Sequence, residues 1–385
     1  MIDKIIIFYG SRRDFENVVE QETESFEEVI PFMELIQHYN ARLRPNDSGV
    51  GEDGLYHRIE VEACVVRADD YASVLEHVLS NFSNIVNVNH DIEVLLVQNP
   101  PKRVRLSLET YYDNIQYLYS EYPIVNRNML KRVYGDLCEN VLGQKSCKKQ
   151  IMSGLYRLTT KKTEKPVVLM LYGPSGVGKT ESAKSISRSL GGNLLRIQLS
   201  MMQTEEAYNY VFGAGHAKGS LAKDMLGRES NVILIDEFDK VNPLFYNAFY
   251  EVFDEGKYVD SNYCVDLSNS IFLCTCNFGS EEEIKRVLGP AMYSRIGCCI
   301  KFEELERQHK EDIIREWYNK IISELEPDER IVIGKTDILE WFLKNVDRYD
   351  NIRLLKTKLE NAIFNELTNT FIVGKRKIIR RIVLP

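Results

Sequence analysis

The sequence predicts an α/β protein whose main domain is a parallel β-sheet with helices on both faces. Apolar, β-prone runs, separated by segments of helical periodicity, occur at 167–172, 194–199, 232–235 and 271–275. This pattern is typical of a buried parallel sheet. The first run leads directly into a glycine-rich loop and then a helix, a second observation that favours an α/β sheet with a phosphate site at its edge.

Residues 1–125 are predicted to form a separate α/β or α+β domain. Strand-like runs alternate there with stretches whose apolar residues have helical spacing. The strand-like runs are 4–9, 56–67 and 92–98, and the helix-like stretches are 25–43, 70–86 and 106–120. Its histidines and its cysteine have no partners at a spacing typical of catalysis, so no catalytic site is expected in this domain.

The charge of the protein is unevenly distributed. The 385 residues are 44% hydrophobic and 28% charged, the balance of a globular protein of two or three domains. The net charge is −8, and residues 1–125 alone hold 10 basic and 22 acidic side chains. Because nucleic-acid binding depends on Lys and Arg that neutralise phosphates, this domain is expected to recruit a protein client or effector instead. Its carboxylates favour a partner with a basic surface.

The distribution of apolar and cysteine residues bears on location and metal content. The first residues lack the pattern of a signal peptide, and no run approaches the roughly 20 apolar residues of a membrane-spanning helix. The eight cysteines lack paired CxxC spacing, so neither a zinc site nor a disulfide framework is predicted. A cytoplasmic protein without membrane contact is expected.

The strongest motif is the segment Gly-Pro-Ser-Gly-Val-Gly-Lys-Thr at 173–180. It matches the phosphate loop of nucleoside triphosphate-binding proteins at every defined position, between a strand and a helix. Lys179 is expected to reach the β- and γ-phosphates, and the Thr180 hydroxyl to coordinate Mg²⁺. The candidate nucleotide-binding residues of this segment are Gly173, Pro174, Ser175, Gly176, Val177, Gly178, Lys179, Thr180 and Glu181.

A second motif is the acidic pair that follows the strand-like run 232–235. Asp236 at the end of a parallel strand is expected to help hold Mg²⁺, together with Thr180. Glu237 is expected to polarise the water that attacks the γ-phosphate. ATP and Mg²⁺ are therefore the predicted cofactors.

Residues 127–385 resemble the AAA+ ATPases, and more narrowly the second ATPase module of the Clp family of unfoldases and disaggregases. Val-Leu-Gly-Gln at 141–144 is similar to a segment that lies against the adenine in this family, which implies adenine contacts for Val141 and Leu142. Asp-Glu-Phe-Asp-Lys-Val-Asn-Pro at 236–243 is similar to the Clp pattern after the second motif. Residues 254–260 with 265–266 look like the hairpin of the Clp branch.

The resemblance also implies roles for three polar residues. Asn277 matches the first sensor, Arg295 the arginine finger that reaches a neighbouring subunit, and Arg353 the second sensor. It further implies a large subdomain at 126–303, a helical lid at 304–385 with a strand-like run at 375–384, and a ring, expected to be a hexamer. Asn277, Arg295 and Arg353, together with Glu237, are the predicted catalytic residues.

One segment departs from the family pattern. Clp unfoldases grip a polypeptide with an aromatic pore loop, whereas residues 213–219 contain no aromatic side chain. His216 and Lys218 are the side chains expected to face a pore. The sequence therefore leaves two main functions open, which are ATP-driven remodelling of a protein substrate or complex, and an ATP-gated assembly switch that regulates a partner effector, for example in a bacterial defence system. A motor acting on nucleic acid is a weaker alternative, supported only by the basic residues of 375–381.

Overall fold

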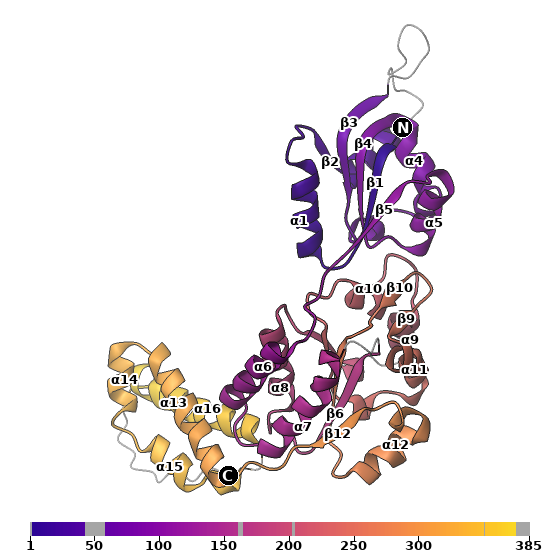
Figure 1. Cartoon of the computed structure of the whole chain (residues 1–385). Helices are drawn as coiled ribbons and strands as arrows, with labels where there is room; N and C mark the ends of the chain where they lie inside the picture. Colours follow the sequence, from indigo (N-terminus) through magenta and orange to yellow (C-terminus); the bar gives the residue numbers. More distant parts are fainter. Residues whose placement is uncertain (1, 43–57, 161–164, 202–204, 350, 375–385) are drawn as a thin grey trace.

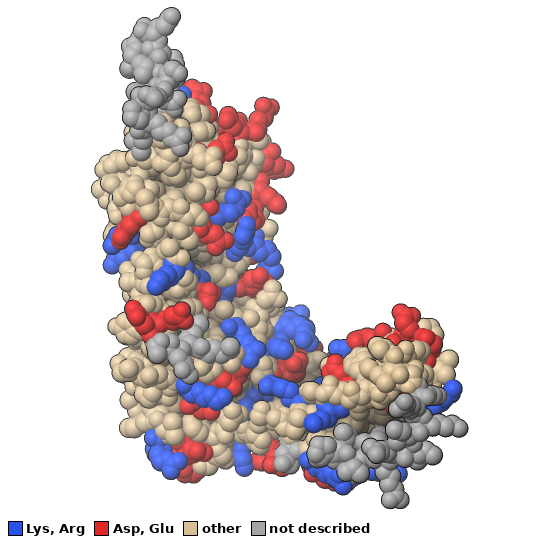
Figure 2. Space-filling view, turned by 180° about the vertical axis from the view of Figure 1, so that it is seen from behind, with Lys and Arg blue, Asp and Glu red and all other residues tan. Residues whose placement is uncertain are grey.

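The computed structural model describes residues 2–42, 58–160, 165–201, 205–349 and 351–374. These residues form an L-shaped molecule, in which the N-terminal domain stands on a central core and a helical lid extends to the side (Figure 1). Lys and Arg gather at the inner corner between core and lid, while Asp and Glu are frequent along one edge of the N-terminal domain (Figure 2).

The N-terminal domain is a parallel α/β sheet, which decides between the two predicted classes. Its strands pair in the order β2-β3-β4-β1-β5, and every pair is parallel. The strands are β1 (Ile2–Tyr9), β2 (Val29–Pro31), β3 (Ile59–Val66), β4 (His90–Gln98) and β5 (Ile115–Tyr119). The helices are α1 (Arg12–Thr23), α2 (Phe32–Arg42), α3 (Glu76–Ser80), α4 (Phe82–Asn89) and α5 (Lys102–Tyr111).

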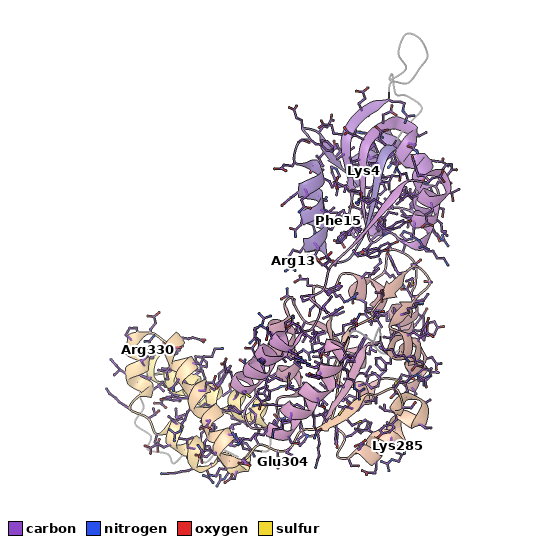
Figure 3. The ribbon with its side chains drawn as sticks, in the orientation of Figure 1. Lys4, Arg13, Phe15, Lys285, Glu304 and Arg330 are labelled. Carbon is purple, nitrogen blue, oxygen red and sulfur yellow. The ribbon has the colours of Figure 1, made fainter. Side chains whose placement is uncertain are left out.

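Helices cover both faces of this sheet. Phe15 of α1 packs on one face, with its ring centroid 5.7 Å from that of Phe8. Lys4 of β1 donates to Glu22 of α1 at 2.6 Å, and Figure 3 labels Lys4 and Phe15. Helices α2 to α5 pack on the opposite face. Because side chains alternate along a strand, Ile5 and Ile7 of β1 point to that second face, and Ile6 points to α1.

The prediction of helix over 106–120 is wrong in its second half. Helix α5 ends at Tyr111, and Ile115–Tyr119 is strand β5, paired with β1. Ile115 and Tyr117 pack on one face of the sheet and Leu118 on the other, so strand pairing with β1 overrides the apparent helical spacing.

The core holds a second parallel sheet, in the order β12-β6-β11-β8-β7. Its strands are β6 (Val167–Tyr172), β7 (Leu195–Ile197), β8 (Val232–Ile235), β11 (Ile271–Cys276) and β12 (Cys298–Lys301). The prediction contained the first four and missed β12, which is short and partly exposed. Every residue of β6, β8 and β11 is buried, which explains their uninterrupted apolar sequences.

Helices sandwich this sheet as the sequence predicts. One face carries α6 (Arg127–Asn140), α7 (Lys145–Tyr156) and α8 (Lys179–Leu190). The other carries α9 (Glu205–Phe212), α10 (Leu221–Leu226), α11 (Tyr246–Glu255) and α12 (Glu281–Tyr293). The predicted hairpin is present as the antiparallel pair β9 (Lys257–Val259) and β10 (Cys264–Asp266).

The lid is a helical cluster that follows the core. It contains α13 (Arg307–Glu324), α14 (Pro327–Ile333), α15 (Ile338–Lys344) and α16 (Ile352–Phe371), which share one apolar core. The strand-like run and basic residues predicted after 374 lie outside the described residues. Within the described part of the chain, no helix is long and apolar enough to cross a membrane.

Candidate nucleotide-binding and catalytic site

The phosphate loop connects β6 to α8, and its glycines adopt angles that other residues avoid. Gly173, Gly176 and Gly178 have φ values of 130°, 83° and 106°, in the region that favours glycine. A Cβ on Gly173 would lie 2.2 Å from the carbonyl oxygen of Phe302. Only glycine fits there, and the loop can turn its backbone N–H groups toward a phosphate at the start of α8.

Lys179 begins α8, and its side chain is almost completely buried. The ammonium donates to the carbonyl oxygens of Gly173 at 2.5 Å and Pro174 at 2.8 Å, and to Oδ1 of Asn277 at 3.0 Å. Burial lowers the pKa of Lys179 because desolvation disfavours its charged form. A cation whose acceptors are neutral oxygens retains its attraction for an anionic phosphate.

A cavity of about 410 Å³ lies between this loop, the carboxyl ends of β8 and β11, and helix α16. Its volume is in the range of small-molecule sites. The predicted residues that line it are Ser175, Gly176, Gly178, Lys179, Thr180, Glu181, Asp236, Glu237, Asn277 and Arg353.

The remaining predicted binding residues lie next to the cavity but do not line it. Gly173 and Pro174 direct their carbonyl groups to Lys179, and Val177 is 4% exposed. Val141 is the C-cap residue of α6 and lies beside Gly178, because a Cβ at position 178 would be 3.0 Å from Cγ1 of Val141. Leu142 follows and is half-buried. Adenine contacts of Val141 and Leu142 stay a prediction.

Asp236 lies at the carboxyl end of β8 and is 7% exposed. Its Oδ2 accepts hydrogen bonds from Nε of Arg196 at 3.0 Å and Nη2 of Arg196 at 2.5 Å. The Thr275 hydroxyl donates to Oδ1, and accepts a hydrogen bond from the backbone N–H of Glu237 at 3.1 Å. Neighbouring strands therefore hold the carboxylate in a fixed orientation.

Glu237 has a left-handed backbone, with φ of 56°, which is uncommon for a residue other than glycine. Its carboxylate accepts hydrogen bonds from Oγ of Ser200 at 2.7 Å and Nζ of Lys240 at 2.9 Å. The hydrogen bond from Ser200, followed by that from Lys240, lowers the pKa of Glu237. The carboxylate is therefore ionised at neutral pH.

Asn277 and Arg353 reach the cavity from different subdomains. Asn277 follows β11 and touches Lys179, while Arg353 lies in the first turn of the lid helix α16. Lys356 lines the cavity one turn later, and its Nζ lies 4.5 Å from the ring centroid of Trp317. The cavity is thus closed partly by the lid.

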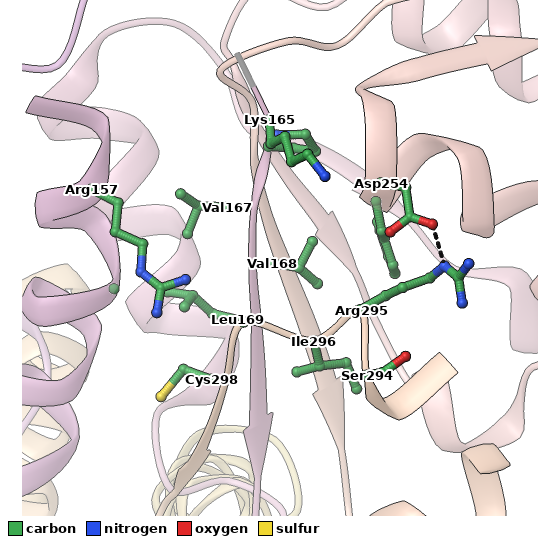
Figure 4. A pocket seen from close by; sticks show the side chains of 14 residues that line it. Arg157, Lys165, Val167, Val168, Leu169, Asp254, Ser294, Arg295, Ile296 and Cys298 are labelled. Atoms are coloured by element: carbon green, nitrogen blue, oxygen red, sulfur yellow. Dashed lines mark hydrogen bonds and ion pairs between the residues drawn. The ribbon is translucent and has the colours of Figure 1, made fainter. Parts of the chain in front are cut away.

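Arg295 is not brought to this cavity. It lines a separate cavity of about 280 Å³, which lies at the amino ends of β6 and β12 and is shown in Figure 4. Its Nε donates to Oδ2 of Asp254 at 2.7 Å, and its guanidinium lies 4.6 Å from the ring centroid of Tyr250. Helix α12 changes direction at Gly289, where φ is 75°, so Arg295 projects from its end.

Several polar residues of the site were missed from the sequence. Arg196, Gln198 and Ser200 occupy alternate positions from β7 onward and share a face toward the acidic pair. That alternation is visible in the sequence and is the signal that could have found them. Thr275 and Lys356 lie within three residues of predicted sensors, but spacing alone does not mark them.

The residues present fit a magnesium-bound nucleoside triphosphate. Thr180 and Asp236 supply the hard oxygen ligands that Mg²⁺ prefers, and both line the cavity that Lys179 borders. The glycine cradle leaves room where a Cβ would clash. Bound Mg²⁺ would neutralise charge on the phosphates.

Comparison with known proteins agrees with this geometry. The model of the family "AAA domain (Cdc48 subfamily)" matches residues 164–327. Chaperone protein ClpB of Rickettsia conorii is 28% identical over 279 residues, which are 62% of this chain and 32% of that protein. A ClpA homolog protein of Fuscovulum blasticum is 35% identical over 151 residues, 37% of this chain and 19% of that protein.

A further relative is the ATP-binding subunit ClpC of an ATP-dependent Clp protease from Staphylococcus aureus. It is 27% identical over 241 residues, 52% of this chain and 29% of that protein. The chain thus covers about a third or less of the length of these curated relatives.

The parallel sheet, phosphate loop and paired carboxylates define a phosphate-loop ATPase of the AAA+ fold. Residues 164–327 match the AAA family model, and this part of the chain is similar to the ATPase modules of Clp proteins.

Proposed function

We propose that the protein hydrolyses Mg-ATP within a homo-oligomeric ring and uses the cycle to remodel a protein substrate or complex. The observation that carries this proposal is the separation of Arg295 from the residues that line the nucleotide cavity. Phosphoryl transfer depends on positive charge at the transferring phosphate, and an arginine supplied by a neighbour contributes about 10³- to 10⁵-fold in rate. A ring, which we expect to be hexameric, would supply that arginine.

Within one subunit, the residues divide the work of hydrolysis. Lys179 and the loop amides bind the phosphates, and Thr180 and Asp236 hold the metal. Glu237 accepts a hydrogen bond from the attacking water and polarises it, while Asn277 orients that water. Arg353 of α16 contacts the phosphates from the lid, so nucleotide binding would also fix the lid against the core.

A mixing experiment tests the division between subunits. Lys179→Ala removes the phosphate lysine, and Arg295→Ala removes the proposed trans arginine, so each variant alone should have almost no ATPase activity. An equimolar mixture should recover part of the wild-type rate, because some sites then pair an intact Lys179 with a neighbour's intact Arg295. A mixture of Lys179→Ala and Glu237→Gln is the matched control and should stay inactive, since both residues serve the same cavity.

The outcomes of this test are distinct. Absence of recovery in the first mixture, with both variants co-assembled on a sizing column, would show that Arg295 does not act between subunits. Wild-type turnover by Arg295→Ala alone would exclude its role as a catalytic residue.

A second candidate function is the ATP-gated switch, and one observation favours it. The non-aromatic loop 213–219 is held against other parts of the same chain. Nε2 of His216 lies 2.8 Å from the carbonyl oxygen of Val74 in the N-terminal domain, and Asn262 of the hairpin donates to the carbonyl of Ala214 at 2.7 Å. In this arrangement His216, which was predicted to face a pore, contacts the N-terminal domain.

The two functions differ in their partners. Remodelling of unfolded chains predicts that unfolded casein stimulates the ATPase, whereas a switch predicts stimulation by one specific partner and none by casein. The Glu237→Gln variant should bind ATP without hydrolysis, assemble, and retain the protein that it normally contacts. Stimulation by DNA or RNA would instead support the nucleic-acid motor, which the acidic N-terminal domain disfavours.

A further inference from the structure

A second large cavity lies between the N-terminal domain and the ATPase core. Its volume is about 520 Å³, against about 410 Å³ for the nucleotide cavity. One wall consists of the carboxyl ends of β1 and β5 and the start of α5, and the other of the β9–β10 hairpin and Arg228. Parallel α/β sheets bind ligands at the carboxyl ends of their strands, and ligand sites are frequent at domain interfaces.

Direct contacts hold these two walls together. The backbone N–H of Lys102 donates to the carbonyl oxygen of Asn262 in the hairpin at 2.8 Å. The Tyr122 hydroxyl donates to the carbonyl of Arg228 at 3.0 Å, and the Arg228 guanidinium lies 4.5 Å from the centroid of the Tyr122 ring. The cavity is therefore bounded by fixed contacts on both sides.

Aromatic side chains form much of the lining. The rings of Tyr9 and Tyr119 stack at a centroid distance of 5.7 Å and an interplanar angle of 22°. Tyr119 is 63% exposed, so its ring can accept another planar ring. Tyr117, Tyr122 and Tyr263 also line the cavity. Aromatic rings of this kind can stack with a nucleobase of any identity, because every base has a π-face.

Three cations complete the lining. Lys102 is exposed at the start of α5. Nε of Arg105, on the same helix, lies 3.8 Å from Oε1 of Glu109. That oxygen already accepts a hydrogen bond from the Tyr117 hydroxyl at 2.7 Å. Arg228 is 7% exposed, and donates to the carbonyl oxygens of Met225 and Asp266.

Two carboxylates are also present, and backbone groups already occupy one oxygen of each. Oδ1 of Asp260 accepts from the N–H groups of Asn262 and Tyr263, and Oδ1 of Asp266 accepts from that of Ser268. All three nitrogens of Arg228 already donate within the chain. Lys102 and Arg105 are thus the cations with hydrogen-bonding capacity for an anion.

The geometry points to a binding site for a small free nucleotide in this interdomain cavity, with the base stacked on Tyr119 and the phosphate bound by Lys102 and Arg105. This ligand is distinct from the ATP of the phosphate loop. Tyr263 between β9 and β10 lines the opposite wall, so a ligand that fills the cavity would also touch the β9–β10 hairpin and fasten it to the N-terminal domain. That hairpin follows α11 directly, the helix whose Asp254 holds Arg295.

The test separates this cavity from the ATP site by using Lys179→Ala as the background. Isothermal titration calorimetry is run on the full chain with AMP, GMP, CMP, UMP and the dinucleotide pApA. At least one of these should bind. Arg105→Ala and Tyr119→Ala should each weaken that binding by about tenfold, the scale of one stacked ring or one charged hydrogen bond.

Two matched control positions lie on helix α5. Arg103 is adjacent to Lys102 but pairs with Glu76, and Tyr111 lies at the end of α5 with 58% exposure. Arg103→Ala and Tyr111→Ala should leave the affinity within twofold of the background. Tyr119 and Arg105 are not in the apolar core, so their variants are expected to fold, which the thermal midpoint checks.

Four outcomes would overturn the proposal. The first two are that none of the five nucleotides binds, or that neither Arg105→Ala nor Tyr119→Ala changes the binding. The others are that inorganic phosphate binds as tightly as the best nucleotide, or that a 15-nucleotide oligothymidylate binds more tightly than any mononucleotide. A supporting readout independent of calorimetry is slower amide hydrogen exchange in 257–266 when the nucleotide is added.

Discussion

The side chain of Arg295 is held by contacts within its own subunit. Asp254 accepts its Nε–H at 2.7 Å, the carbonyl of Ala291 accepts from Nη1 at 2.7 Å, and Tyr250 lies under the guanidinium. These contacts fix the direction in which the guanidinium is presented. Asp254 is therefore a positioning residue if Arg295 acts on a neighbouring subunit.

Asp254→Asn should lower kcat by about 10- to 100-fold, the scale of a misplaced catalytic group. The KM for ATP should change little, because Asp254 does not line the nucleotide cavity. Steady-state ATPase measurements at a protein concentration that gives full assembly check this. Glu251→Gln on the exposed side of the same helix is the control, and an equal loss in both variants would contradict the positioning role.

The Glu237 carboxylate carries a prediction about pH. Its pKa is lowered chiefly by the hydrogen bond from Ser200, so the wild-type rate should fall only at a pH below the ordinary glutamate range. Ser200→Ala removes that bond, raises the pKa of Glu237 and should move the acidic limb of the kcat profile to higher pH. Profiles of both proteins from about pH 3, below the ordinary range of a glutamate carboxyl, to about pH 8 check the shift. Coincident acidic limbs would contradict it.

At the scale of elements, α16 links the lid to the phosphate loop. Asn351 caps this helix, as its Oδ1 accepts from the N–H groups of Arg353 at 2.8 Å and Leu354 at 3.4 Å. The same oxygen would lie 3.1 Å from a Cβ on Gly176. The cap thus sets where α16 begins and where Arg353 enters the cavity.

Asn351→Ala should destabilise the protein by about 1 kcal/mol, the usual effect of losing an N-cap, and should also weaken ATP binding. Trp317 lies beside Lys356 of the cavity wall, so its fluorescence provides the binding measurement. Asn126→Ala is a matched control, because Asn126 caps α6 in the same way with 3.0 Å bonds. That variant should lose similar stability and keep its ATP affinity, and equal affinity in both variants would argue against the link.

At the scale of the whole molecule, the N-terminal domain rests on two segments of the core that were compared with the Clp pattern. These are the loop 213–219 and the hairpin of β9 and β10, which contact the domain through His216 and Asn262. If the acidic domain, shown in Figure 2, binds a partner as proposed, these contacts would connect that partner to the core.

His216→Ala should release the loop from the N-terminal domain and speed tryptic cleavage after Lys218 several-fold, because proteolysis follows local opening. Mass spectrometry of the fragments over time gives the rate. His77→Ala, at an exposed position of α3, serves as the control. Unchanged cleavage after Lys218 in His216→Ala would mean that this hydrogen bond does not restrain the loop.

Local sequence was sufficient for much of the core and of the site. The phosphate loop needs glycines at fixed positions beside a strand and a helix, so Gly173 to Thr180 could be recognised without long-range information. The buried strands β6, β8 and β11 are continuous apolar runs, because both of their faces are covered. Asp236 and Glu237 follow such a run, and their place at the carboxyl edge is set by the parallel arrangement.

Tertiary structure decided the features that depend on residues distant in the chain. The sequence by itself determined the α/β class, the phosphate loop and the acidic pair, since each is a pattern of neighbouring residues. Pairing of β5 with β1, the partners of Glu237 and Asp236, the clamp of Asp254 on Arg295 and the cavity between the domains each join segments far apart in the chain. Those contacts arise only when sheets and helices pack, because local periodicity carries no information about which distant side chain will fill a given position.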